Sequence, residues 1–379
     1  MRYIKPQYYD TFKCTADKCP DTCCAGWQIM IDEDSLKRYE SVTGEFGERL
    51  KHSIDWSEGS FLQKCGCCAM LNDKNLCDLV INCGEESLCE TCNRYPRHIE
   101  EFEGLREYSL SISCPVAAEI VLGCEEPLSL MEEEDESEDP LWEEFEDFDF
   151  LLFTKLEDAR EVIFKLIQQN ETTPLEKFMQ EILKFAGEMQ ACVDEDRVFD
   201  VDAVIQAFAK LHEDAALGET AATCDEEKRF YRLKDSFSIL YSLERMRPEW
   251  TEVLDETWDT LYADGFEQYQ KLRTRFLQQY GEGGNMQREW HVFQRNLLLF
   301  FLYTYLCGAV YDDWIYSKVA LSVFSVIFVQ EFVMCRYFLA DNIIDKHEWV
   351  QLAYRYAREV EHSNDNLNLL EEWLQNENG

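Results

Sequence analysis

Cysteine is the residue whose number and spacing in this chain point most directly to chemistry. The 379 residues include 17 cysteines, and thirteen of them fall within the first 124 residues. All but Cys124 form two close-spaced sets, which run from Cys14 to Cys24 and from Cys65 to Cys114. Four thiolates around one centre make a structural zinc site, and four also hold a 4Fe–4S cluster. The spacing therefore predicts a metal-binding module.

The spacing alone does not single out four ligands. Cys89 and Cys92 form a Cys-x2-Cys pair of the kind found in zinc sites. A proline directly after a cysteine, as at Cys114 and Pro115, is frequent in iron–sulfur sites and favours iron over zinc. The cysteines are too many for one ion: the adjacent residues Cys23 and Cys24 and all the other cysteines cannot together be ligands of a single site. A buried set of reduced cysteines without metal stays as the alternative.

The elements that follow the cysteine module are predicted to be helical. An acidic run over residues 132–139 precedes Pro140, so we interpret 125–140 as a solvated linker. From Leu141 onward apolar residues recur at three- and four-residue spacing, which predicts an all-α domain over 141–379. The fold class is thus mainly α, with a loop-rich cysteine module over 1–124.

Individual helices can be placed from the same pattern. In the large domain they are predicted near residues 174–189, 198–213, 226–246, 249–280, 288–311, 314–339, 346–362 and 366–375. In the cysteine module we expect short helices over 34–39 and 115–122 and a strand over 108–113. The cysteines of the helical domain stand singly and are predicted to be packing residues: Cys192, Cys224, Cys307 and Cys335.

Composition limits the partners and the compartment. The formal net charge is −40, which argues against nucleic acid and anionic membranes as partners and favours basic proteins or simple solubility. The first residues contain no apolar signal segment, and the apolar stretches 297–311 and 319–329 are shorter than the ~20 residues of a membrane span. A cytoplasmic location is expected. In that reducing compartment the cysteines would not form a disulfide framework.

Several cysteine motifs resemble those of a known family. The run Cys19-Pro-Asp-Thr-Cys23-Cys24-Ala-Gly-Trp27 is similar to the zinc- or iron-chelating cysteine-cluster proteins, and the arrangement over residues 14–118 resembles the flagellin lysine N-methylases. Further matching segments are Cys68-Ala-Met-Leu71, Leu76-Cys77, Thr91-Cys92-Asn-Arg-Tyr95-Pro96-Arg97 and Leu110-Ser-Ile-Ser-Cys114-Pro115. The cysteines matched to this pattern are Cys14, Cys19, Cys23, Cys24, Cys68, Cys77, Cys92 and Cys114. Cys89 is added because it completes the pair with Cys92.

The resemblance implies methyl transfer from S-adenosylmethionine to lysines of flagellin, by an enzyme with an iron–sulfur cluster. No Cys-x3-Cys-x2-Cys triplet and no strand-bounded Gly-x-Gly-x-Gly motif is present, so the donor site cannot be placed by motif. Arg94 and Arg97 follow Cys92 and could hold the carboxylate of the donor or offset the charge of a thiolate-bound cluster. The alternative functions are a redox sensor or scaffold that binds metal, and an oxidoreductase that uses the cluster.

Overall fold

The computed structural model describes residues 1–137, 139, 141, 145, 148–169, 174–215 and 225–376, with the side chains of 213–215 left out. Cys224 lies outside this part. The expectation of a mainly α fold is confirmed, because helices make up most of the described chain. The helices of the first 124 residues are α1 (Glu33–Ser41), α2 (Gly44–Lys51), α3 (Asp78–Cys83), α4 (Glu90–Arg94) and α5 (Pro115–Leu122). Those that follow are α6 (Phe150–Gln169), α7 (Leu175–Asp194), α8 (Val201–Ala215), α9 (Glu226–Ser242), α10 (Trp250–Thr257), α11 (Phe266–Tyr280), α12 (Gln287–Tyr305), α13 (Ile315–Leu339), α14 (Lys346–Glu361) and α15 (Asn364–Asn376).

The helical body is built around α13. This helix packs against α7, α12, α14 and α15, and nearly all of its side chains are buried. It is long and apolar enough to cross a membrane by length and composition alone, but 94% of its most apolar window is buried inside the structure. Such burial is the usual condition of a central core helix. The cysteines Cys192, Cys307 and Cys335 are buried in this body, as their packing role predicts.

The predicted single helix over 249–280 is wrong. The chain instead forms α10, a π-helical turn at Trp258–Tyr262, and α11. Gly265 separates the two helices with a backbone φ of +81°, a left-handed conformation that glycine adopts without steric cost. The apolar periodicity continues through this break, which is why the pattern alone did not reveal it.

A four-stranded sheet joins the N-terminus to the helical body. Its strands are β1 (Arg2–Pro6), β6 (Arg97–Phe102), β7 (Leu105–Leu110) and β8 (Leu130–Glu134), in the order β6-β7-β1-β8. β1 runs parallel to β7 and antiparallel to β8. Ile4 and Leu105 point into the core shared with the helices, and Glu107 of β7 forms a buried ion pair with Arg160 of α6.

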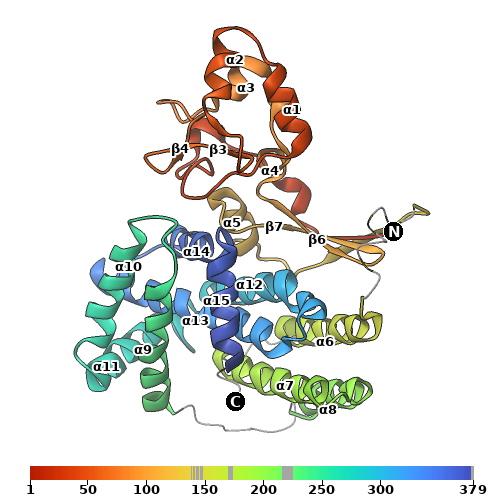
Figure 1. The fold of residues 1–379 in the computed structure, drawn as a ribbon. Helices are drawn as coiled ribbons and strands as arrows, with labels where there is room; N and C mark the ends of the chain where they lie inside the picture. The colour runs from red at the N-terminus through yellow and green to blue at the C-terminus, as the bar shows by residue number, and fades with distance from the viewer. Residues whose placement is uncertain are drawn as a thin grey trace.

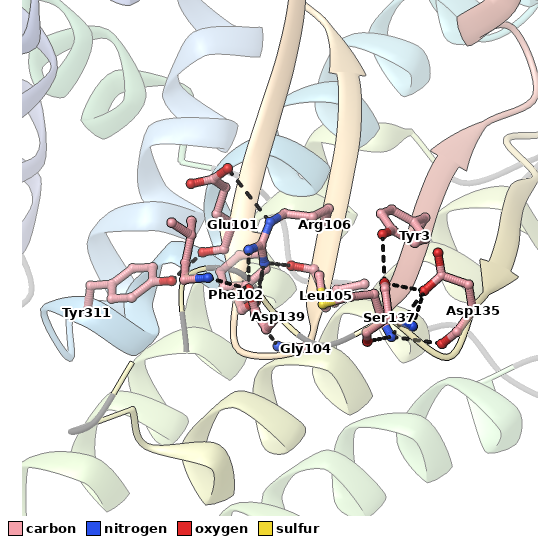
Figure 2. Close-up of polar contacts among 12 residues, drawn as sticks. Tyr3, Glu101, Phe102, Gly104, Leu105, Arg106, Asp135, Ser137, Asp139 and Tyr311 are labelled. Carbon is pink, nitrogen blue, oxygen red and sulfur yellow. Dashed lines mark hydrogen bonds and ion pairs between the residues drawn. The ribbon is translucent and has the colours of Figure 1, made fainter. Parts of the chain in front are cut away.

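The first part of the acidic run predicted as a linker belongs to this sheet. Residues 130–134 form the edge strand β8, and Glu132 pairs with Arg2 on β1 at 2.8 Å. The segment after it is also anchored, because Asp139 accepts hydrogen bonds from the Gly104 amide and from the buried Arg106 guanidinium (Figure 2). The like-charge run suggested solvation because its basic partners lie 130 residues earlier in the chain.

The two hydrophobic cores do not follow the predicted boundary at residue 124. The buried residues of a small core lie between Ile29 and Cys89, with partly buried residues from Cys24 to Cys92 packed against them. In contrast, β1, β6, β7 and α5 contribute to the large core of the helical body. Figure 1 shows the small body with α1–α4 above α5 and the sheet. Two pairs of two-residue strands lie in the small body: β2 (Ile54–Asp55) with β3 (Ser60–Phe61), and β4 (Gln63–Lys64) with β5 (Cys67–Cys68). Most predicted ligands belong to this small body or to its junction with α5.

Candidate metal centre

Four of the predicted ligands gather where the small body meets α5. We call Cys14, Cys19, Cys23 and Cys114 the loop thiols. The pKa of Cys23 is raised, first by a hydrogen bond with the thiol of Cys24 and then by burial. Cys14 and Cys114 lie near enough to raise this pKa further. Burial raises the pKa of Cys114, and Cys19 adds to that effect. The loop thiols therefore share one neighbourhood although residue 114 is far from the others in sequence.

The other five predicted ligands lie within the small hydrophobic core. We call Cys24, Cys68, Cys77, Cys89 and Cys92 the core thiols, and all of them line or pack against that core. The Cys68 amide donates a hydrogen bond to the Cys24 carbonyl at 2.7 Å, which fixes the two segments side by side. Burial raises the pKa of Cys68 to about 12, and Cys24, Cys77 and Cys89 contribute to that rise. These thiols are thus a second group, enclosed by apolar side chains.

Two pairs of thiols share a hydrogen bond: Cys23 with Cys24, across the two groups, and Cys89 with Cys92, within the core thiols. The bond from Cys23 lowers the pKa of Cys24 to about 7. In the same way the bond with Cys92 lowers the pKa of Cys89, while that of Cys92 is raised. One sulfur of each pair is therefore stabilised as a thiolate, the form that binds metals.

Three predicted ligands each stand at the position directly before a helix. Cys77, Cys89 and Cys114 are the N-caps of α3, α4 and α5. Burial raises the pKa of Cys77 and Cys114, and N–H groups of the following helical turn act in the opposite direction. Free amides at helix N-termini favour negative charge, so these positions suit a thiolate. Pro115 at the start of α5 fits because its missing N–H has no helical partner there.

The cations that face the loop thiols come from the helical body. Arg358 of α14 contacts Asp21, in the loop between Cys19 and Cys23, at 2.6 Å. Its Nε also donates to the Ser113 carbonyl at 2.8 Å. Arg247 donates to the same Asp21 carboxylate at 2.7 Å. Sequence reasoning missed both arginines because they lie more than 220 residues after the loop that they hold.

The loop also needs a residue without a side chain. Gly26 has a φ of +90°, and a Cβ there would stand 2.7 Å from the Met246 carbonyl oxygen. Any other residue would force the cysteine loop away from the helical body. This requirement is specific to the close approach of two backbones.

The two arginines singled out in the sequence lie elsewhere. Arg94 forms an exposed ion pair with Glu90 one turn earlier in α4. The Arg97 guanidinium lies 5.3 Å from the ring centre of Phe12 and 5.9 Å from that of Tyr9. These contacts are with side chains other than the loop thiols, and the role of both arginines toward a donor stays a prediction.

A partly buried histidine adjoins the loop thiols. His362, directly after α14, has its Nε2 3.0 Å from the Ser113 hydroxyl and its ring 4.8 Å from that of Trp27. Burial lowers the pKa of His362 to about 3, and Arg358 adds to the effect. Its Nδ1 is a buried atom with no hydrogen-bond partner in the described structure. The histidine is therefore neutral at physiological pH and links the first cysteine loop to the helical body.

The number and type of the thiols can be compared with the ligands that a zinc or iron–sulfur site requires. Each group supplies at least four thiols, which fits a four-thiolate zinc or iron–sulfur site in number and type. Within the residues that the structure describes, no group of three or more Cys, His, Asp or Glu side chains converges as a metal site would require. All sixteen described cysteines are free thiols. The chemistry of the donors fits, and which of them bind metal stays a prediction.

One spacing went unnoticed in the sequence. Cys65 and Cys68 have the same Cys-x2-Cys separation as Cys89 and Cys92. Cys65 is exposed on the turn between β4 and β5, whereas Cys68 is buried with the core thiols. The two cysteines of this pair therefore differ in exposure, because Cys65 lies on the turn and Cys68 on the strand that follows it.

The comparisons with known proteins bear on the helical body. The family described as the FliB lysine N-methylase C-terminal domain matches residues 160–379. The chain belongs to this family. The FliB match covers the second half of α6 and all of α7 to α15, so it includes Arg247, Arg358 and His362 and leaves out the cysteine-rich body.

Similar proteins come from Salmonella. The lysine-N-methylases of Salmonella typhimurium LT2 and Salmonella choleraesuis are each 26% identical over 137 residues, which is 34% of this chain and 34% of those proteins. The flagellar biosynthetic protein FliU of Salmonella muenchen is 26% identical over 137 residues, 81% of its length. The FliB-family chain thus aligns with about a third of the length of the two lysine-N-methylases. No solved structure matches it.

Proposed function

We propose that this chain is a protein lysine N-methyltransferase that methylates flagellin with S-adenosylmethionine as donor. The observation that carries the proposal is the membership of residues 160–379 in the FliB lysine N-methylase family. Its relatives include proteins named as a lysine-N-methylase and as a flagellar biosynthetic protein. The strongly acidic composition agrees with a lysine-bearing protein as partner, and with the absence of nucleic acid or membrane as a partner. We place the protein in the cytoplasm.

We further propose that the loop thiols hold a 4Fe–4S cluster and that the core thiols form a closed structural site, for which zinc is suited. Cys114 with its following proline belongs to the loop thiols, and such a proline is frequent beside iron–sulfur ligands. The loop thiols lie at the junction with the family-matched body, where Arg358 offsets negative charge. The core thiols are surrounded by apolar residues, as in structural zinc sites that admit no substrate.

Methyl transfer places clear demands on this protein. The lysine nitrogen attacks the methyl carbon, the bond from that carbon to the donor sulfur breaks, and a proton leaves the nitrogen. A lysine has a pKa near ~10.4 and must lose its proton before it can attack. A bound cluster would supply a polarising or electron-transferring centre. The chain itself must bind the lysine-bearing partner, exclude water and hold the first cysteine loop in place, a task for which Arg358 and Arg247 are arranged.

The experiment is methylation of purified flagellin by anaerobically purified protein and S-adenosylmethionine, followed by mass spectrometry of flagellin peptides. We expect lysine-containing peptides to gain mass in steps of one methyl group. Flagellin with acetylated lysines, which leaves no attacking nitrogen, is the matched substrate control. Iron, sulfide and zinc are measured on the same sample. Absence of transfer by protein that retains its metal would contradict the methylase proposal.

A further inference from the structure

The exposed face of the sheet carries a hollow lined by aromatic rings. Tyr3, Lys5, Tyr9, Tyr108 and Glu133 line this hollow, which has a volume of about 290 Å³. None of the loop thiols or core thiols lines it. No role for it follows from the family match, because residues 1–159 lie outside that match.

The register of the sheet explains why these side chains share one face. Tyr3 on β1 is paired directly with Glu133 on β8 and with Arg106 on β7. Side chains alternate along a strand, so Tyr3 and Lys5 point away from Ile4, which is buried in the large core. By the same alternation Glu133 lies on the aromatic face, and Glu132 and Glu134 lie on the other.

The rings form a corner. The Tyr9 and Tyr108 rings stand 5.6 Å apart at 69°, and the Tyr3 ring lies 6.5 Å from that of Tyr108. Tyr9 is buried and held by the neighbouring Arg97, whereas Tyr3 and Tyr108 are half-buried. The Tyr3 hydroxyl points toward Ser137, 3.5 Å away, in the segment that follows β8 (Figure 2). The walls are therefore fixed by packing before any ligand arrives.

The chemistry of the walls selects a cation that water hydrates weakly. Aromatic faces attract cations, and several rings with a carboxylate are the means by which proteins bind methylated lysine. An unmodified ammonium keeps its water shell more tightly and gains less from such a site. Glu133 supplies the carboxylate at the rim. Lys5 also lines the hollow, and its charge is met by Asp10 at 2.9 Å and Glu133 at 4.0 Å.

We propose that this hollow binds the methylated lysine side chain of a protein. The identity of this ligand rests on the proposed function, because a lysine methyltransferase produces that group. A single methylated lysine side chain, bound in the corner formed by the three tyrosine rings, suffices to hold a methylated segment on the enzyme. The site would keep a multiply modified partner bound between transfers.

The test uses the full chain and three small probes: the acetylated N-methylamides of lysine, Nε-dimethyllysine and Nε-trimethyllysine. Binding is measured by calorimetry, without methyl donor, so that it does not depend on catalysis. We expect the methylated probes to bind more tightly than lysine. Tyr3→Ala should weaken their binding about three- to tenfold, as loss of one partly desolvated cation–π contact implies, and Tyr3→Phe should preserve it.

Matched variants distinguish binding in the hollow from a general effect of surface charge. Glu133→Gln should weaken binding, whereas Glu134→Gln, on the other face of the same strand, should leave it unchanged. Lys5→Gln should strengthen binding because it removes a like charge and frees Glu133. Thermal unfolding of each variant shows that it is folded. Equal affinity for all three probes, or binding indifferent to Tyr3→Ala in a folded protein, would overturn the proposal even if the chain methylates flagellin. Probe binding without any methylation of flagellin would overturn only the proposed function.

Discussion

Two adjacent residues, Cys23 and Cys24, belong to different thiol groups. The Cys23 sulfur lies near Cys14 and Cys114, whereas Cys24 contributes to the environment of Cys68 and Cys92. The two thiols share a hydrogen bond, so the doublet lies where the two groups meet and can contribute one thiol to each. This arrangement explains why the sequence holds more cysteines than one centre can use.

The doublet gives the sharpest test of the two groups. Cys23→Ser should remove most of the iron and sulfide while leaving the small core folded, because only a loop thiol is lost. Cys24→Ser should lower the melting temperature of the small body and release any zinc, since metal binding and folding are linked. Iron, sulfide and zinc are measured per chain. Cys192→Ser, in the core of the helical body, is the control and should change none of the three. Identical metal losses in the two doublet variants would show that they serve one site.

His362 makes the junction sensitive to acid. Its pKa is lowered by burial from 6.5 to about 3, so the unfolded chain binds a proton at a pH where the folded chain does not. Its contribution to stability is therefore present above pH 6.5 and is lost as the pH falls from there toward 3.

At pH 5.5, one unit below the unfolded pKa, this loss amounts to about 1.4 kcal/mol. His362→Phe keeps a ring against Trp27 and Tyr95 but cannot be protonated. We expect its unfolding free energy to change less than that of the parent between pH 7 and pH 5.5, measured by urea denaturation. Equal pH dependence in the two proteins would mean that His362 does not carry this sensitivity.

At the scale of elements, α14 is the helix that connects the two bodies. Its Arg358 is almost fully buried and contacts both Asp21 and the Ser113 carbonyl, on two different segments of the thiol junction. Asp21 is also held by Arg247, so the first cysteine loop is fastened at two points. The family-matched body thus determines where the loop thiols lie.

Arg358→Gln should lower the unfolding free energy by about 2–3 kcal/mol, because it leaves the partly buried Asp21 with one arginine fewer. In metal-free protein, Cys19 and Cys23 should then react faster with an alkylating reagent than in the parent, as followed by mass spectrometry. Arg94→Gln removes only an exposed pair and should cost no more than about 0.5 kcal/mol. If Cys19 and Cys23 were alkylated at the same rate in both variants, Arg358 would not be what keeps the first cysteine loop in place.

The elements were more predictable from the sequence than their contacts. Helices α5, α13 and α14 lie within a residue or two of their predicted limits, because strong apolar periodicity and Pro115 mark them locally. The division of the cysteines into two groups depends on neighbours far apart in sequence, such as Cys23 and Cys114. The arginines that face the loop thiols lie more than 220 positions after the loop that they contact. The strand β8 was missed for the same reason, since an acidic segment forms an edge strand only when a basic strand lies beside it.

At the scale of the whole molecule, the charge is extreme. A net charge of −40 gives the surface a negative potential that draws positively charged partners toward it and speeds their encounter. Part of this charge is fixed in place, because β8 holds three consecutive glutamates at the edge of the sheet. The hollow with Glu133 lies at that same edge. Electrostatic attraction of the partner and binding of its methylated lysine would therefore take place on the same side of the molecule.

This argument predicts how salt affects the proposed reaction. Exposed charges lose their reach beyond a Debye length of ~8 Å at physiological ionic strength, so the apparent KM for flagellin should rise several-fold between low and physiological salt. The transfer step takes place within a site, and kcat should stay nearly constant. Initial rates at increasing salt measure both quantities. The double variant Glu133→Gln, Glu134→Gln should show a shallower rise in KM than the parent. The matched variant Glu33→Gln, Asp34→Asn removes two exposed carboxylates from α1 and should behave like the parent if β8 is the steering edge. A KM that does not respond to salt in the parent would remove steering altogether and leave the charge as a determinant of solubility.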